Sequence, residues 1–439
     1  MIGYKKYKLT PSLGFEKIPA EWDLKKVKYL FHIGRGRVIS QEELMDNGLY
    51  PVFSSQTQNN GCLGYINTFD FDCDQLTWTT DGANAGTVFI RSGKHNCTNV
   101  CGTLQPIKDQ TNLKFSHYAL QYATQFHKRP DTNGAKIMNN EMAEISFALP
   151  AECEQFKIIE YLDYETAKID TLIANQEKLI ELLKEKRQGV ISHAVTKGLN
   201  PNVPMKDSGV EWLGEVPEHW IVTKIGFHTL KIGSGKTPKG GAEIYQDEGV
   251  LFIRSQNVYN DGLKIDSSES VYISEAIHDD MATSKVSSGD ILLNITGGSI
   301  GRSSLVPDGF PEANVNQHVC IIRVHEYIRD FLASVIQSDL IQAQIRSIQT
   351  GGNREGLNFE QISKFSFALP PQVERKEIIQ YIQHKLYEFK KVEDKANKVV
   401  QLMQERRTAL ISAAVTGKID VRNWQNPNNN NEAKMEFSA

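Results

Sequence analysis

The stretch ISFALPAECEQFKIIEYL, residues 145–162, returns as FSFALPPQVERKEIIQYI at residues 365–382. The match continues without a gap to the end of each copy, LLKEKRQGVISHAVT (182–196) and LMQERRTALISAAVT (402–416). Of the 52 aligned positions that begin at Ile145, 18 are identical. Internal similarity at one fixed spacing shows that the chain contains two related halves.

Each copy predicts one long helix. Both expected helices begin directly after a proline, Pro150 in the first copy and Pro370-Pro371 in the second, which suits the first turn of a helix. Apolar residues then recur in steps of three, four and seven, the pattern of an amphipathic helix with a coiled-coil seam. The seam comprises Ile169, Leu172, Leu179, Leu183 and Val190 in the first copy and Phe389, Val392, Val399, Met403 and Leu410 in the second. A helix over residues 152–195 is roughly 65 Å long at 1.5 Å per residue.

A helix of this length exposes its apolar stripe unless another element covers it. Its own repeat is the nearest candidate, so we expect an intramolecular coiled coil or helical pair. Identical residues concentrate at the two ends of the copies, nine within 146–161 and seven within 185–196. We therefore interpret the variable middle as a spacer and the repeated ends as docking surfaces for a partner or a domain.

A weaker repeat precedes each helix. IPAEW (18–22) matches VPEHW (216–220), and IGRGR (33–37) matches IGSGK (232–236). Each half therefore has a Pro-x-x-Trp entry, a mixed region with short strand-like runs, and a long helix. The predicted organisation is a mixed domain at 1–150, a long helix at 151–197, a Pro/Gly/Asn-rich linker at 198–215, a second mixed domain at 216–370, a second long helix at 371–418, and a disordered, Asn-rich tail at 419–439.

Composition is that of a soluble globular protein, with 40% hydrophobic and 23% charged residues. We expect a cytoplasmic location, because the sequence has no apolar run of membrane-spanning length and no apolar stretch behind its first lysines. The six cysteines show no paired spacing and are expected to be reduced thiols. His95, Cys97 and Cys101 have no fourth ligand at a familiar spacing, so we expect no metal site.

The stretch IGSGKTPKGG (232–241) resembles the end of a phosphate-binding loop, but the pattern is incomplete. A P-loop needs a glycine five residues before Gly235, where this chain has Leu230, and Pro238 follows the Lys-Thr pair directly. The sequence also has no Asn-Pro-Pro-aromatic tetrapeptide, the signature of adenine methylation, and no helicase box. PDTNGAK (130–136) lacks the acidic residue of a nuclease motif. We expect a non-catalytic chain.

Several stretches together carry a resemblance to a known family. The linker TKGLNPNVPMKDSGVEWLGEVPEHW (196–220), the duplicated FALP helix entries, the duplicated helix ends and I-x-S-G-K-T-P resemble the specificity subunit of type I restriction–modification enzymes. The resemblance implies an α+β fold in which two mixed α/β target recognition domains are joined by two long helices. It also implies that the helices form an antiparallel coiled coil with a pseudo-twofold internal repeat.

The resemblance further implies a function. Each domain would recognise one half of a bipartite DNA site, while the helices set the spacer and dock two modification subunits. S-adenosylmethionine would bind those methyltransferase subunits, and restriction subunits would use ATP and Mg²⁺, so this chain would bind no cofactor. Because the two mixed regions differ strongly in sequence, we expect an asymmetric site. The repeated helix ends suit two copies of one partner.

Candidate DNA contacts follow from the chemistry of groove recognition. Arg, Gln and Asn contact base edges, whereas Lys and backbone amides hold phosphate. The first-domain candidates are Arg35, Arg37, Gln56, Gln58, Asn59, Asn60, Arg91, Lys94 and Lys136. The second-domain candidates are Lys236, Thr237, Arg254, Gln256, Asn257, Arg302, Asn316, Gln317 and Arg354. The candidates for partner docking are Glu154, Tyr161, Glu185, Arg187, Glu374, Tyr381, Glu405 and Arg407.

The net charge of −4 leaves DNA binding open, because it hides a segregation: residues 1–150 carry 16 basic and 14 acidic residues, whereas residues 198–370 carry 14 basic and 21 acidic ones. Any DNA contact must then come from local basic patches. Two other hypotheses remain at this point. The first is a coiled-coil adaptor with two protein-binding domains and no role on DNA. The second is a nucleotide-driven enzyme that depends on Lys236.

Overall fold

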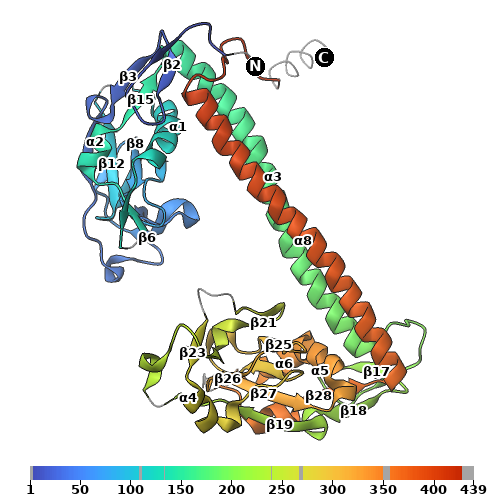
Figure 1. Cartoon of the computed structure of the whole chain (residues 1–439). Helices are drawn as coiled ribbons and strands as arrows, with labels where there is room; N and C mark the ends of the chain where they lie inside the picture. The colour runs from blue at the N-terminus through green and yellow to red at the C-terminus, as the bar shows by residue number, and fades with distance from the viewer. Residues whose placement is uncertain are drawn as a thin grey trace, which may run out of the picture. The chain divides into compact units, whose positions relative to one another are not determined.

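A computed structural model describes residues 3–107, 111–132, 134–238, 240–265, 270–349 and 356–427. The chain forms two compact units, the first from residues 1–177 and 398–439 and the second from residues 178–397. Each unit holds one globular domain and one end of each long helix, α3 (Glu152–Lys197) and α8 (Gln372–Val415) (Figure 1). Among the described residues, no helix is both long and apolar enough to cross a bilayer.

The domain of the first unit contains one four-stranded antiparallel sheet, in the order β10–β8–β12–β4. A second sheet, β6–β5–β11–β7, includes the parallel pair β5–β11. The strands are β1 (Tyr7–Leu9), β2 (Lys17–Pro19), β3 (Asp23–Lys26), β4 (Phe31–Arg35), β5 (Tyr50–Phe53), β6 (Cys62–Ile66), β7 (Phe71–Asp72), β8 (Gln75–Thr79), β9 (Asp81–Gly82), β10 (Val88–Arg91), β11 (Lys94–Cys97), β12 (Cys101–Pro106), β13 (Arg129–Asp131), β14 (Gly134–Lys136) and β15 (Ser146–Leu149). Helix α1 (Leu113–Ala123) packs on β10 and β15, and α2 (Asn139–Glu144) precedes β15 (Figure 1).

The domain of the second unit repeats this topology. Its antiparallel sheet has the order β25–β24–β27–β19, and β20 and β26 form the parallel pair. The strands are β16 (Met205–Asp207), β17 (Glu215–Pro217), β18 (Ile221–Lys224), β19 (Thr229–Ser234), β20 (Val250–Ile253), β21 (Val258–Tyr259), β22 (Gly262–Leu263), β23 (Val271–Ile273), β24 (Ile291–Asn294), β25 (Ser303–Leu305), β26 (Ala313–Val315), β27 (Val319–Val324) and β28 (Ser366–Leu369). The shorter helices are α4 (Glu275–Asp280), α5 (Arg329–Gln337), α6 (Asp339–Gln349) and α7 (Phe359–Lys364).

The duplicated SFALP motif has the same structure in both units. Strand β15 pairs with β3, and β28 pairs with β18, so each SFAL segment lies beside the strand that follows the Pro-x-x-Trp entry. Phe147 and Phe367 are fully buried at these strands. The proline then ends the strand, because it has no N–H for a further ladder bond, and the long helix begins within two residues.

The repeated tryptophan is joined to the start of each long helix. The indole Nε1–H of Trp22 donates to Glu154 at 3.0 Å, and that of Trp220 donates to Glu374 at 3.1 Å. Both tryptophans are almost completely buried. Each tryptophan therefore attaches the entry turn of its domain to the first turn of the helix that follows that domain.

Within each unit, the ends of α3 and α8 run side by side in opposite directions (Figure 1). In the first unit, Ile158 and Leu162 share a core with Ile411 and Ala414, and Arg407 is ion-paired with Asp170 at 2.8 Å. In the second unit, Ile191, Ala194 and Val195 share a core with Ile378 and Ile382. The antiparallel coiled coil predicted above is thereby confirmed.

The seam is closed less completely near the middle of the helices. Ile169 and Ala396 are buried, whereas Leu172, Leu179 and Val392 stay between 37% and 45% exposed. A helix pair without a third element cannot cover a stripe wider than its seam. The central turns therefore present apolar surface to the surroundings.

The structure corrects the prediction of a disordered tail for residues 419–427. Val421 is fully buried in the first core, and Trp424 packs edge-on against Tyr161 at a ring separation of 5.4 Å. Arg422 is ion-paired with Asp420 at 2.6 Å. The Asn-rich composition hid these anchors, while residues 428–439 lie outside the described residues.

The linker contains a strand. Residues Met205–Asp207 pair with Glu215–Pro217, just as β1 pairs with β2 ahead of Trp22 in the first unit. A glycine with a left-handed backbone follows the end of each long helix, Gly198 after α3 with φ 74° and Gly417 after α8 with φ 69°. The repeat therefore extends to the hairpin ahead of each Pro-x-x-Trp entry.

We predict a pH dependence of stability for the first unit that involves His117 on α1. Burial, together with the positive charges of Arg407, Arg91 and Lys114, lowers the pKa of His117 to about 4. An unfolded histidine titrates near pH 6.5, so below that pH the unfolded chain binds a proton that the folded chain excludes. The contribution of His117 to the unfolding free energy should be constant above about pH 6.5 and should fall by up to about 1.4 kcal/mol per pH unit between about pH 6.5 and 4.

Hydrogen exchange of the full chain measures this effect. The exchange rates of the α1 amides are compared at several pH values. The variant His117→Gln should remove part of the slope. An equal slope in the His117→Gln variant and the wild type contradicts the assignment.

Candidate nucleic-acid interface

The repeated I-G-x-G motif serves a close contact between backbones in both domains. A Cβ atom on Gly36 would lie 2.0 Å from the carbonyl oxygen of Cys97, and one on Gly235 would lie 1.6 Å from that of Val315. No side chain fits at such distances, so glycine is required here for close approach. Residues 236–238 after Gly235 do not begin a helix, and the nearest following element is a 3₁₀ turn at Gly241–Ile244. The Gly-Lys-Thr sequence is therefore not a phosphate-binding loop of the P-loop type.

This contact gathers three polar segments at one end of the first domain. We call residues 35–37, 54–61 and 98–99 the first loop end. Arg37 N–H donates to Cys97 O at 3.1 Å, Thr98 N–H donates to Phe53 O at 2.8 Å, and Thr98 Oγ1 donates to Ser54 Oγ at 3.1 Å. Strand order and the parallel β5–β11 pair thus place the segments side by side.

The second domain has the equivalent arrangement. We call residues 234–237, 254–257 and 316–317 the second loop end. Asn316 N–H donates to Ile253 O at 3.0 Å, and Gly235 packs on the carbonyls of Val315 and Asn316. Asn294 Nδ2 donates to Ser255 O at 2.8 Å and holds the middle segment in place. Both domains therefore present polar loops of different sequence from one common framework.

Of the 18 predicted DNA contacts, 13 lie at these loop ends, and nine of those 13 have exposed side chains. Arg35, Gln58, Asn59 and Asn60 are exposed in the first, while Gln56 is half-buried. The exposed residues of the second loop end are Lys236, Thr237, Gln256 and Gln317, with Arg254 half-buried. Arg37 is exposed, and its ion pairs with Glu43 at 2.9 Å and Asp70 at 3.2 Å raise its pKa and orient its guanidinium group.

Burial corrects the prediction for Arg91. Its side chain is only 2% exposed and lies 3.6 Å from the ring centre of Phe53, so it has no route to DNA. Burial lowers the pKa of Arg91 to about 10, which leaves it charged at neutral pH. Nε donates to Thr77 at 3.1 Å and Nη1 donates to Asn60 O at 2.8 Å. Arg91 is therefore a positioning residue for loop 54–61.

Loop 54–61 needs such support, because Asn59 and Asn60 both have a left-handed backbone, with φ of 49° and 51°. We predict that Arg91→Met leaves the fold intact but loosens this loop. Charge-assisted hydrogen bonds contribute about 1.5–3 kcal/mol each, so exchange of the loop amides should accelerate roughly 10- to 100-fold. Hydrogen exchange of peptide 54–61 measures this, with the exposed Lys94→Met as the matched control. Unchanged exchange in Arg91→Met contradicts the positioning role.

Burial also corrects two predictions in the second domain. Asn257 is 2% exposed; its Oδ1 accepts from Arg254 N–H at 3.0 Å and its Nδ2 donates to Lys264 O at 2.9 Å. Asn316 is 8% exposed, and its Oδ1 accepts from His318 N–H at 3.1 Å. Both amides shape the loop rather than face solvent. The predicted contact Arg354 lies outside the described residues.

Three other predicted contacts are not part of the loop ends. Lys94 begins β11, at the end of that strand away from Cys97, and lies 4.5 Å from the ring centre of Phe69. Lys136 is on β14 and is ion-paired with Asp131 at 3.2 Å. Arg302 precedes β25 and lies 4.9 Å from the ring centre of Tyr259.

The structure also corrects part of the predicted partner-docking set. Glu154 and Tyr161 are 8% and 4% exposed and belong to the first core or its edge. Glu374 is engaged by Trp220 and by His219 at 2.8 Å, and Arg407 is paired with Asp170. Glutamate therefore recurs in the first turn of both long helices because Glu154 and Glu374 each accept a hydrogen bond from a tryptophan. Glu185, Tyr381 and Glu405 are exposed, and Arg187 is half-buried.

Sequence reasoning missed the turn after β11. Residues 98–99 occupy the position that Asn316 and Gln317 occupy after β26, and Asn99 is exposed. No residue is identical between the two turns, so only strand register makes the equivalence visible. The turn sequence T-N-V before β12 was the available signal.

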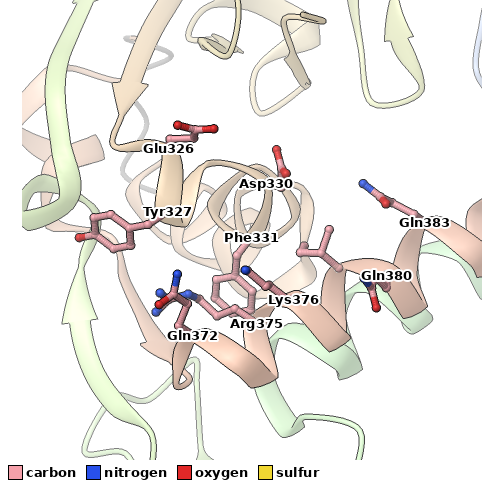
Figure 2. Close-up of a pocket in the computed structure, with 10 residues that line it drawn as sticks. Glu326, Tyr327, Asp330, Phe331, Gln372, Arg375, Lys376, Gln380 and Gln383 are labelled. Atoms are coloured by element: carbon pink, nitrogen blue, oxygen red, sulfur yellow. The ribbon is translucent and has the colours of Figure 1, made fainter.

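A cavity of about 510 Å³ lies between the start of α5 and the start of α8 in the second unit (Figure 2). Its lining mixes the acidic Glu326 and Asp330 with the basic Arg375 and Lys376. In the first unit, Asp163 of α3 accepts from Tyr118 of α1 at 2.9 Å and pairs with Lys114 at 2.6 Å. Among the described residues, no group of three or more His, Cys, Asp and Glu side chains could hold a metal ion.

Comparison with known proteins agrees with the duplicated architecture. The family model of the type I restriction modification DNA specificity domain matches residues 19–182 and 217–401. The N-terminal part of a putative type I specificity subunit from Mycoplasma pneumoniae is 42% identical over 139 residues, which is 31% of this chain and 74% of that relative. The chain spans between 43% and 74% of the length of three such relatives from that organism.

Two further comparisons extend over nearly the whole chain. The type I restriction enzyme MjaVIII specificity subunit from Methanocaldococcus jannaschii is 24% identical over 435 residues, covering 93% of this chain and 95% of the relative. A solved structure from work on complex assembly and conformational transition of the type I R-M system shares the fold, with a TM-score of 0.64, 10% identity, and coverage of 92% of this chain and 99% of that one. The chain belongs to the family of type I restriction–modification DNA specificity subunits.

Proposed function

We propose that this chain recognises an asymmetric, bipartite DNA sequence for a type I restriction–modification complex. One observation carries the proposal: two domains of the same topology present loop ends built from different polar residues. A shared framework gives both domains the same way of approaching a duplex. Different loops give each domain its own half-site, since sequence is recognised by side chains at base edges.

The long helices are proposed to set the spacing between the half-sites and to dock two modification subunits. Antiparallel packing of two related helices creates two equivalent ends, which suits two copies of one partner. The exposed repeated residues Glu185, Tyr381 and Glu405 support docking there. Leu182 and Leu402, 48% and 49% exposed, add apolar surface of the kind found at protein interfaces.

We further propose that the chemistry resides on the partner subunits, within the cytoplasm. Modification subunits would bind S-adenosylmethionine and methylate adenine, and restriction subunits would use ATP and Mg²⁺. The sequence supports this division, because it lacks the Asn-Pro-Pro-aromatic signature and a complete P-loop. This chain would then contribute recognition and assembly alone.

Genome-wide adenine-methylation mapping with and without this gene tests the proposal. We expect the loss of one methylated motif, made of two short dissimilar halves around an unspecified gap. Unchanged methylation, in cells shown to express a working modification subunit, contradicts the proposal and favours a coiled-coil adaptor. Lys236→Ala should leave the motif methylated, since Lys236 would hold phosphate and not hydrolyse a nucleotide.

A further inference from the structure

A second cavity in the second unit, of about 450 Å³, gathers basic side chains from both long helices and from the domain. It lies between the second half of α3, the middle of α8 around residues 389–393, and the β21–β22 hairpin. Its basic lining residues are Lys184 and Arg187 from α3, Lys264 and Arg302 from the domain, and Lys390 from α8. Asp261 and Glu393 are its acidic residues. We call the first four of the basic residues the basic groove.

The four cations of the basic groove are not engaged in ion pairs with described residues, although Asp261 and Glu393 line the same cavity. Lys390 is ion-paired with Asp394 at 2.9 Å. Within the described ranges, none of Lys184, Arg187, Lys264 and Arg302 has an ion pair of its own. Two of the four, Lys264 and Arg302, belong to segment 198–370, where acidic residues outnumber basic ones by 21 to 14. Gathered cations repel one another, so an anionic ligand would relieve the repulsion.

The basic groups are also held in place. The Lys264 ammonium lies 4.2 Å and the Arg302 guanidinium 4.9 Å from the ring centre of Tyr259, so both contact one aromatic face or edge. Arg187 Nη2 donates to Asn260 O at 3.3 Å. Asn260 is fixed in turn, because its Oδ1 accepts from Ser303 N–H at 2.9 Å and its carbonyl accepts from Gln337 Nε2 at 3.2 Å. A ligand would therefore meet preorganised cations rather than free side chains.

The basic groove continues from the second loop end. Asn294 joins them: its N–H donates to Arg302 O at 2.8 Å, and its Nδ2 donates to Ser255 O at 2.8 Å. Residues 254–257 of the loop end lead directly into β21 and Tyr259. A duplex bound at the loop end would present its backbone next to this surface.

We propose that the basic groove binds backbone phosphates of the target DNA on the spacer side of the second half-site. Helix α3 would then contact DNA through Lys184 and Arg187, in addition to spacing the domains. This assigns Arg187 to DNA rather than to partner docking. The inference rests on the proposed function, because it requires a duplex at the second loop end. Phosphate contacts of this kind add affinity without adding sequence information.

The test uses the full chain co-purified with its modification subunits and a duplex that contains the methylated motif. The variant carries Lys184→Gln, Arg187→Gln, Lys264→Gln and Arg302→Gln. The control carries Lys206→Gln, Lys224→Gln, Lys391→Gln and Lys395→Gln, which removes the same number of charges from the same unit outside the cavity. The dissociation constant is measured at several salt concentrations for motif and scrambled duplexes. Single variants Lys184→Gln and Arg302→Gln cover the case in which the fourfold variant does not fold.

The affinity for DNA falls as the salt concentration rises, and we expect this dependence to be less steep in the fourfold variant. The magnitude of the slope of log affinity against log salt should decrease by about two to four, roughly one for each lost phosphate contact. Affinity for the motif and the scrambled duplex should fall by the same factor, so their ratio should stay unchanged. The control should keep the wild-type slope. Each single variant should lower the slope by about one.

Three outcomes overturn the inference. An unchanged slope in a folded variant shows that the groove does not contact phosphate. Loss of modification subunits from the complex, with an unchanged slope for what remains assembled, shows that the groove binds a protein partner. A wild-type complex without salt-dependent duplex binding refutes the proposed function itself, and the inference fails with it.

Discussion

Replacing Trp22 with alanine is expected to lower the unfolding free energy of the first unit by about 3–5 kcal/mol, the range for a buried tryptophan. Trp22 is 1% exposed and packs edge-on against Tyr4, with ring centres 5.5 Å apart. The substitution leaves a cavity and also removes the indole N–H from the buried Glu154. A buried carboxylate that loses a donor is costly in its own right. Trp220→Ala should have the same effect on the second unit.

Hydrogen exchange of the full chain separates the two units in this experiment. Trp22→Ala should raise exchange in α1 and β12 while leaving β27 unchanged, and Trp220→Ala should do the reverse. Trp212→Ala is the matched control, because Trp212 is 44% exposed and should cost little. Trp22→Phe keeps an aromatic ring but removes the indole N–H, so it should cost about 1–3 kcal/mol for the lost hydrogen bond in addition to a smaller cavity cost than that of Trp22→Ala. Equal stability of Trp22→Ala and Trp212→Ala contradicts the proposed role of the entry tryptophan.

Replacing Gly235 with alanine is expected to displace β19 from the turn after β26 and to abolish recognition by the second domain. The new Cβ would lie 1.6 Å from Val315 O, a backbone atom that cannot rotate away. Forcing a methyl group into a packed site costs about 1–3 kcal/mol or more, and here it moves two segments of the second loop end apart. Gly36→Ala should do the same to the first domain through Cys97 O, 2.0 Å away.

The matched control is Gly298→Ala, since a Cβ there meets nothing within 4 Å and the backbone is not left-handed. It should bind the motif as the wild type does. Gly235→Ala should lose the preference for one half-site while keeping its modification subunits, as shown by binding to duplexes with either half scrambled. Normal discrimination at both halves in Gly235→Ala shows that the loop end does not contact bases.

The architecture was largely predictable, because the decisive residues recur in both halves. The SFALP segments, the helix ends and the Pro-x-x-Trp entries fixed the order of the elements, and the seam fixed the helix pair. The reason for their recurrence was not predictable. Glu154 and Glu374 looked like docking residues, and only the structure places each one against a tryptophan indole. The tail beyond Lys418 was mispredicted because composition does not reveal which of its residues, such as Val421, reach a core.

The loop ends were predictable in part. Polar, turn-prone sequence located 54–61 and 254–257, but it could not distinguish Asn59, which is exposed, from Asn257, which is buried. The difference depends on hydrogen bonds made after the strands have assembled. Arg91 was misassigned for the same reason, because strand pairing with β8 points it into the domain beside Thr77. The turn at 98–99 was invisible until β11 and β26 could be matched by their parallel partners.

The central claim is that each domain recognises its half-site independently on a shared framework. Replacing residues 31–137 by a second copy of residues 229–357 tests it most directly, since β4 and β19 begin these segments and Ile137 and Leu357 make equivalent backbone bonds at their ends. The claim predicts that methylation mapping of cells with this chain yields a palindromic motif, two inverted copies of the second half-site around the original gap. The claim is contradicted if the original asymmetric motif is still methylated. It is also contradicted if no motif is methylated although the complex is shown to be assembled.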